Sequence, residues 1–139
     1  MATVELRFSA LPEHVRTARL VAAAVARRAG VDESVLDELR LAVGEACSRA
    51  VALHQRNGVD GAVRVALIEQ EKRFLIEVAD EAGPTHAAGA AVNGGDPEDE
   101  DALGLAVITG LVEDVEVGNG SEGGVIRMSW PLTPVSVAV

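Results

Sequence analysis

The chain has 139 residues, and its formal net charge is -10, from 22 acidic and 12 basic side chains. This length predicts one domain, residues 1–139, with room for a real core. The acidic balance argues against nucleic acid or an anionic membrane as a partner, because both are bound through lysine and arginine. Only 2% of the residues are aromatic, so the core must pack aliphatic helices against a sheet.

Cysteine content and the N-terminal segment bear on the compartment. Cys47 is the one cysteine and cannot form an internal disulfide. Its place beside Ala46 within a helical pattern favours a small core residue over a reactive thiol. The opening MATVELRF has charges at Glu5 and Arg7 and lacks the apolar stretch of a signal peptide. A cytoplasmic location is therefore expected.

The first half of the sequence predicts one strand and two helices. Alternation in VELRFSA, residues 4–10, predicts a strand at a sheet edge. Pro12 begins a helix that Gly30 ends. Asp32 is the expected N-cap of a second helix, which runs to about Arg56. Steps of three and four residues turn one face of this helix toward a core, at Leu36, Leu39, Val43, Ala46, Ala50 and Leu53.

The second half predicts two antiparallel hairpins, separated by a long loop and a third helix. The loop, about residues 81–101, is expected to be a flexible acidic lid, because such long loops are usually functional or disordered. The helix would start at Ala102 and be entered through Gly104, and the tail 133–139 would be peripheral. We expect the strands at 62–70, 73–80, 113–119 and 123–132. This order predicts an α/β fold, a two-layer α/β sandwich with a mostly antiparallel sheet and helices on one face.

Glu45 and Arg49 are the candidate functional pair of the second helix. They lie off its apolar stripe and four residues apart, so they share a face. A carboxylate held there by a buried helix could be a general base. The same spacing fits an ordinary solvated ion pair worth about 0.3–0.5 kcal/mol. No metal-ligand spacing relates the histidines, which are His14, His54 and His86.

Three segments resemble, in order and spacing, the conserved boxes of the GHKL ATPase family, and in particular its bacterial anti-sigma factor serine kinases. They are LRLAVGEACSRAVALH at 39–54, IEVADEAG at 76–83 and DALGLAVITGLVEDVEV at 101–117. The opening SALPEHVRTARLVAAAVARRAG at 9–30 also resembles the family's first helix. The resemblance implies the Bergerat type of α/β sandwich and a kinase that uses ATP and magnesium.

The resemblance also assigns residues. It makes Glu45 the general base, Asp80 the acceptor of the adenine amino group, and Gly104 the glycine of a turn where a helix N-terminus meets phosphate. The implied ATP pocket comprises Arg49, Asp80, Gly83, Gly104 and Leu105. The implied partner contacts on the first helix are Arg16 and Arg19. A homodimer, paired through the sheet and first helix, is expected from the resemblance alone.

Two boxes depart from the family pattern. Arg49 stands where the family has an asparagine that holds magnesium, and arginine offers only donors. It would repel the cation and pair with Glu45, although it could instead neutralise phosphate directly. In the second box Ala82 and Pro84 replace glycines. Alanine is a mild loss if its φ is negative and a steric problem if its φ is positive.

The distribution of charge along the sequence also argues against tight binding of ATP. Between Arg73 and Arg127 the sequence has no lysine or arginine but twelve acidic residues. A triphosphate would meet repulsion there, although an ordinary solvated lid would have the same composition. The twelve are Glu77, Asp80, Glu81, Asp96, Glu98, Asp99, Glu100, Asp101, Glu113, Asp114, Glu116 and Glu122.

Three functions follow from these observations. The first is an anti-sigma-factor-like, partner-switching regulator of transcription that binds a sigma factor, an anti-sigma factor antagonist, or both. It would have weak or lost ATP binding, and neither a cofactor nor a metal. The second is an active protein serine kinase that phosphorylates its antagonist with ATP and magnesium, using Glu45 as base. The third is a binding domain that has kept the fold without the family's role. The altered boxes favour the first.

Overall fold

The computed structural model describes residues 2–82, 96–119 and 123–132, with the backbone alone for residues 96–103. The described strands form one sheet in the order β1-β2-β3-β5-β4, and every neighbouring pair is antiparallel. The strands are β1 Thr3–Ser9, β2 Ala62–Glu69, β3 Arg73–Ala79, β4 Asp114–Asn119 and β5 Gly124–Pro131. The helices are α1 Pro12–Ala29, α2 Glu33–Asn57 and α4 Asp96–Leu111.

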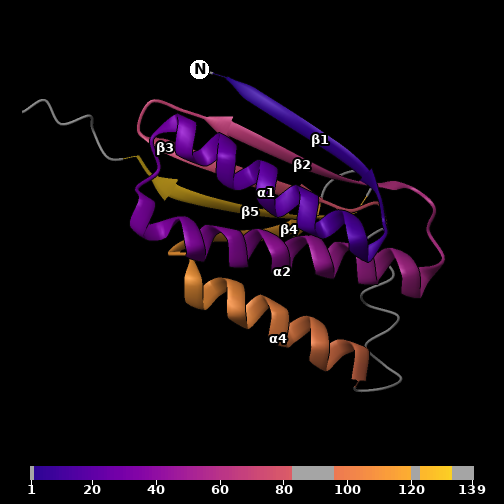
Figure 1. Ribbon diagram of the computed structural model, residues 1–139. Helices are drawn as coiled ribbons and strands as arrows, with labels where there is room; N and C mark the ends of the chain where they lie inside the picture. The colour runs from indigo at the N-terminus through magenta and orange to yellow at the C-terminus, as the bar shows by residue number, and fades with distance from the viewer. Residues whose placement is uncertain (1, 83–95, 120–122, 133–139) are drawn as a thin grey trace, which may run out of the picture.

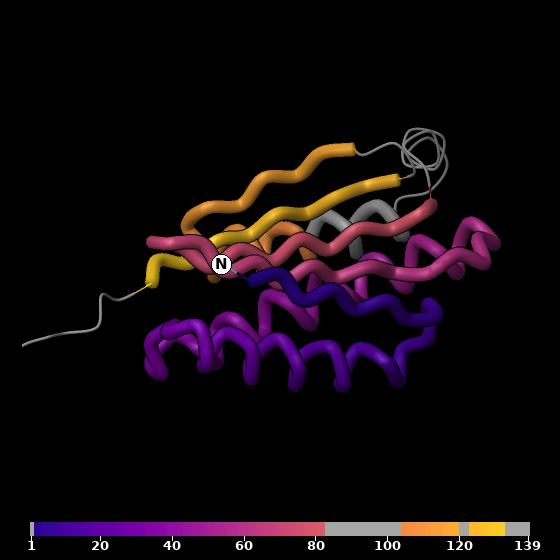
Figure 2. The backbone as a smooth tube through the Cα atoms, turned by 90° about the horizontal axis from the view of Figure 1, so that it is seen from above, coloured from indigo at the N-terminus to yellow at the C-terminus, as the bar shows by residue number. Residues whose placement is uncertain are grey.

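The helices cover one face of the sheet, which confirms the predicted two-layer sandwich (Figures 1 and 2). α1 contacts β1 and β2, α2 contacts β2 and β3, and α4 packs on α2 and reaches β4. Every residue of the apolar stripe predicted for α2 is buried. Among the described residues, no helix has the length and apolarity needed to cross a membrane.

The ends of α1 and α2 lie where the sequence predicted them, because the capping residues act locally. Gly30 follows α1 with φ 109°, and Gly58 follows α2 with φ 64°, a left-handed region that suits glycine. Asp32 caps α2 by accepting a hydrogen bond from the Ser34 amide at 2.8 Å. That hydrogen bond lowers the pKa of the Asp32 carboxyl.

The start of α4 differs from the prediction. The helix begins at Asp96, not at Ala102, because Asp96-Pro97 followed by acidic residues is a helix-starting sequence. The residues of the predicted lid from Asp96 onward are therefore helical, and residues 83–95 lie outside the described part, as does the tail 133–139. Gly104 lies inside α4, where backbone amides bond to carbonyls one turn earlier. The prediction that the third helix is entered through Gly104 is therefore wrong.

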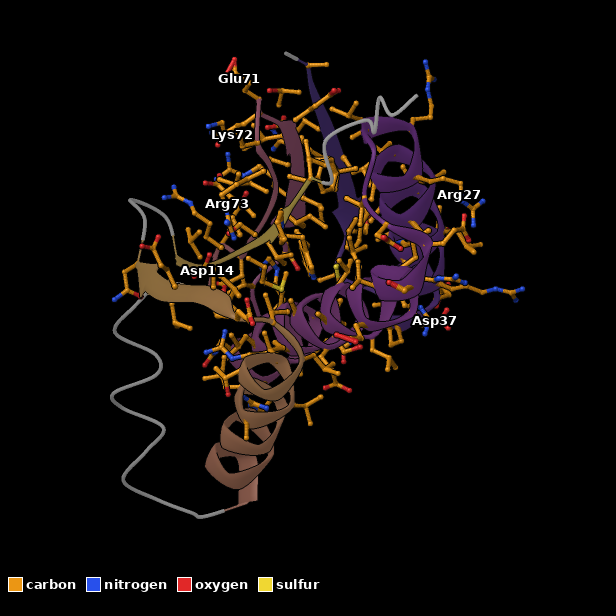
Figure 3. All side chains as sticks on the ribbon, turned by 90° about the vertical axis from the view of Figure 1, so that its left-hand side faces the viewer. Arg27, Asp37, Glu71, Lys72, Arg73 and Asp114 are labelled. Carbon is orange, nitrogen blue, oxygen red and sulfur yellow. The ribbon has the colours of Figure 1, made fainter. Side chains whose placement is uncertain are left out.

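Cross-strand ion pairs lie on the sheet face opposite the helices. Arg73 of β3 pairs with Asp114 of β4, and Figure 3 shows the two side chains close together. Arg127 of β5 contacts Glu77 of β3 at 2.6 Å and Glu116 of β4 at 3.4 Å. These pairs tie the edge strand β4 to the centre of the sheet, each with a small contribution because it is exposed.

Candidate functional site

Glu45 and Gly104 face one another where α2 packs on α4. A methyl group added at Gly104 would lie 3.6 Å from Oε2 of Glu45. Ile108, one turn later in α4, is fully buried, and Leu105 is half-buried against the core. The fold therefore brings together residues of the first and third boxes, as the resemblance implied.

Arg49 lies one turn beyond Glu45 and is half-buried. Its Nε is buried and has no hydrogen-bond partner in the described part of the chain. No ion pair joins Arg49 to Glu45 within residues 2–82, so the predicted pairing of the two is wrong. Spacing by four residues permits such a pair without requiring it, and the Glu45 carboxylate lies toward Gly104 instead. The candidate base is therefore not bound by the neighbouring arginine.

Asp80 is fixed by backbone hydrogen bonds at the end of β3. Its side chain is only 4% exposed, and Oδ1 accepts hydrogen bonds from the amides of Ala82 and Gly124, each at 3.0 Å. The Asp80 amide donates to the Gly124 carbonyl, also at 3.0 Å. A Cβ at Gly123 would lie 2.3 Å from the Asp80 carbonyl oxygen. The start of β5 can therefore approach Asp80 only because glycines stand there.

Ala82 resolves one of the two alternatives left open for the second box. It is 2% exposed, and no non-glycine residue among the described ones has a positive φ. Alanine in place of glycine is thus the mild loss rather than the steric problem. Gly83 and Pro84 lie outside the described residues. The adenine end of the candidate pocket therefore keeps its carboxylate in a defined orientation.

His54 connects α2 to the end of β3. Its ring is 1% exposed, and Nε2 accepts a hydrogen bond from the Glu81 amide at 2.9 Å. An accepting Nε2 places the proton of the neutral ring on Nδ1, which has no partner among the described residues. His54 thus holds the residue after Asp80 against the helix of Glu45. Spacing in the sequence does not predict this hydrogen bond, because it joins residues 27 positions apart.

Replacing His54 is expected to loosen this connection. In His54→Leu the Glu81 amide loses its acceptor in a partly buried place, so the free energy of unfolding should fall by about 2 kcal/mol. Urea denaturation followed by circular dichroism measures the change. His14→Leu is the control, because the exposed contact of His14 with the Ser9 carbonyl at 3.1 Å and its edge contact with the Phe8 ring both stay within one short stretch of the chain. Equal losses in the two variants would contradict this assignment.

Arg49 stands at the position where the resemblance implies a magnesium ligand, one turn beyond Glu45. Arg49 has only donors and cannot bind a cation. Within the described residues, no group of three or more histidine, cysteine, aspartate or glutamate side chains could hold a metal ion. Gly104 offers no free helix N-terminus.

Cys47 has no part in the site. It is fully buried in α2, and burial raises the pKa of its thiol to about 12. The thiol therefore stays protonated and unreactive near neutral pH. The prediction of a small core residue is confirmed.

α1 presents a basic face away from the sheet. Arg16 is exposed, whereas Arg19 is half-buried because its side chain lies along α2. Figure 3 shows Arg27 pointing away from the sheet, and it pairs with Glu33 at 3.0 Å. Leu20, beside Arg19, is 55% exposed. An apolar side chain among arginines is a composition typical of a protein-binding surface.

Comparisons with known proteins identify a family model and relatives that match most of this chain. A family model described as "Histidine kinase-like ATPase domain" matches residues 8–130. The serine-protein kinase RsbW of Bacillus pumilus is 34% identical over 131 residues, covering 82% of this chain and 76% of that protein. Its namesake from Bacillus subtilis is 29% identical over 133 residues, covering 85% and 79%.

One similar solved structure contains the RsbU and RsbW domains of a Mycobacterium tuberculosis protein. It matches with a TM-score of 0.65 and 19% identity, over 98% of this chain and 35% of that one. At this identity the likeness supports the fold alone.

Proposed function

Because the chain belongs to the histidine kinase-like ATPase family and is related to the serine-protein kinases RsbW, we propose that it is an anti-sigma-factor-like partner-switching regulator. It binds a sigma factor, an anti-sigma factor antagonist, or each in turn, and so regulates transcription in the cytoplasm. Its ATP pocket is degenerate, and it works without ATP or magnesium.

Arg49 is the observation that carries this proposal. The family resemblance puts a magnesium-binding amide at this position, and the chain has a half-buried guanidinium there. Its Nε is enclosed and finds no acceptor among the described residues. A fixed positive charge without a lone pair opposes a divalent cation. Binding to other proteins needs neither the cation nor the nucleotide.

An active protein serine kinase is the second candidate, and one observation favours it. Within the described residues, the Glu45 carboxylate is free of Arg49 and lies beside Gly104, so the candidate base is still available. In this alternative, Glu45 would take the proton of a serine hydroxyl on the antagonist as the γ-phosphate of ATP is transferred. Arg49 would then neutralise phosphate directly. Nucleotide titration separates the two candidates.

α1 is the proposed contact surface for the protein partner. Its arginines stand out in a chain with a net charge of -10, so they favour a partner with carboxylates at its surface. Leu20, 55% exposed beside Arg19, supplies apolar contact area. Arg16 and Arg19 are the residues proposed to bind.

A homodimer through β1 is also proposed. β1 is an edge strand of the sheet, and among the described strands it pairs only with β2. Val4 is 38% exposed and Phe8 is half-buried. An edge strand with exposed apolar side chains suits pairing with a second copy of the chain.

Charge reversal at Arg19 tests the proposed partner surface. The probes are the recombinant sigma factors and antagonist domains of the source organism, and biolayer interferometry measures the dissociation constant. Native protein is expected to bind at least one of them, and Arg19→Glu should bind it at least about tenfold more weakly, because like charges would then meet. Arg28→Glu, on the same helix, is the control and should bind as the native protein does. Native protein that binds none of the probes would contradict the proposed function.

A further inference from the structure

The side chain of Arg19 rests directly on Gly44 of α2. A Cβ at Gly44 would lie 2.7 Å from Cδ of Arg19, 3.4 Å from its Cγ and 3.7 Å from its Nε. The first of these distances is too short for any real methyl group. The aliphatic stem of Arg19 therefore occupies the space that any other residue at position 44 would fill.

Glycine is an unusual residue at position 44, in the middle of a long helix. It is buried in the interior of α2, far from both ends, where glycine is the least favourable residue apart from proline. Its φ is not in the left-handed region, since the positive-φ glycines of the described residues are Gly30 and Gly58. Backbone conformation therefore does not require glycine here, whereas the contact with Arg19 does.

Arg19 also differs from the other arginines of α1. Arg27 is paired with Glu33 at 3.0 Å, and Arg28 is exposed. The stem of Arg19 is held by α2, yet no acidic side chain of the described residues pairs with its guanidinium. The aliphatic stem of Arg19 is thus held in place, and its guanidinium can still donate hydrogen bonds to a partner.

We infer that Gly44 is a positioning residue for partner binding: it fixes Arg19 along α2 so that the guanidinium meets a carboxylate of the protein partner. This inference rests on the proposed function, in which Arg19 contacts the partner. A side chain that is already ordered loses less conformational entropy on binding. Gly44 therefore increases the affinity for the partner without contacting it, because it leaves space for the Arg19 stem along α2.

Gly44→Ala separates this positioning from a structural role. The added methyl group forces the Arg19 stem off α2, and the flexible side chain can move into solvent. Alanine also favours the helix, so the thermal unfolding midpoint should be unchanged or higher. Partner affinity should nevertheless fall about tenfold, because Arg19 must then be ordered during binding. A purely structural glycine would not change stability and affinity in opposite directions.

The experiment compares native protein, Gly44→Ala, Arg19→Ala and the double variant, with the sigma factors and antagonist domains of the source organism as probes. Because Gly44 acts through Arg19, the double variant should bind no more weakly than Arg19→Ala alone. Gly110→Ala is the matched control, since a Cβ at this helical glycine of α4 meets nothing within 4 Å. Nuclear Overhauser contacts between Gly44 Hα and Arg19 Hδ report the geometry without any partner, and they should disappear in the variant.

Three outcomes would overturn the inference and leave the proposed function in place. Gly44→Ala could bind as tightly as native protein although the Overhauser contact is lost. Its loss of affinity could add fully to that of Arg19→Ala, or the native protein could lack the Overhauser contact. A fourth outcome, in which the native protein binds none of the probes, would overturn the proposed function together with the inference. Binding by the native protein therefore distinguishes a failure of the proposed function from a failure of Gly44 to position Arg19.

Discussion

Native protein is expected to give no heat of binding when titrated with magnesium and ATP at millimolar concentration, and Arg49→Asn is expected to bind at least about 100-fold more tightly. The substitution removes a half-buried positive charge from the phosphate end of the pocket. It also supplies an amide oxygen, the kind of ligand that magnesium accepts. A 100-fold gain is about 2.7 kcal/mol, which one restored cation ligand and one removed repulsion can provide.

Isothermal titration calorimetry with ATP and with ADP, each with magnesium, measures this change. Arg40→Asn is the matched control: Arg40 is another half-buried arginine of α2, paired with Asp37 at 3.0 Å, and its loss should leave nucleotide binding unchanged. Micromolar binding by the native protein would refute the degenerate pocket and favour the active kinase. If Arg49→Asn bound no better than the native protein, the cause would lie elsewhere in the pocket, such as the helical backbone at Gly104.

Gly123→Ala is expected to lower the free energy of unfolding by about 3 kcal/mol, at the upper end of the cost of overpacking. The added Cβ would lie 2.3 Å from the carbonyl oxygen of Asp80, 2.6 Å from its Oδ1 and 2.8 Å from its carbonyl carbon. Two of these are backbone atoms, which cannot rotate away as a side chain can. Relief requires the start of β5 to move off Asp80, and this also strains the hydrogen bond from the Gly124 amide.

Urea denaturation followed by circular dichroism measures the loss in Gly123→Ala. Gly118→Ala in the neighbouring strand β4 is the control, because a Cβ there meets no atom within 4 Å, and its stability should stay within about 0.5 kcal/mol of the native value. A loss in Gly123→Ala no larger than in the control would mean that β5 does not press on Asp80. The conclusion that these contacts hold the Asp80 carboxylate in a defined orientation would then be refuted.

Local signals in the sequence were sufficient for most of the fold. The stripe of α2 was predicted in full, because steps of three and four residues leave one buried face whatever packs on it. Gly30 and Asp32 marked helix ends through their own backbone preferences. The β2–β3 hairpin followed from alternation and a short connection. The sequence predicted the start of α4 too late, because the helix-starting pair Asp96-Pro97 follows a long stretch rich in glycine and alanine that is typical of a loop.

For the candidate site too, some features could be predicted from the sequence and others depend on the tertiary structure. By itself, the sequence placed Glu45 and Arg49 on one helix face and Asp80 after a strand, because these positions depend on neighbours in the chain. Only the tertiary structure decided that Glu45 lies toward Gly104 and not against Arg49, that His54 accepts from the Glu81 amide, and that Arg19 rests on Gly44. These contacts join segments far apart in the sequence, and short-range spacing carries no information on which of several possible neighbours a side chain meets once the helices and sheet have packed.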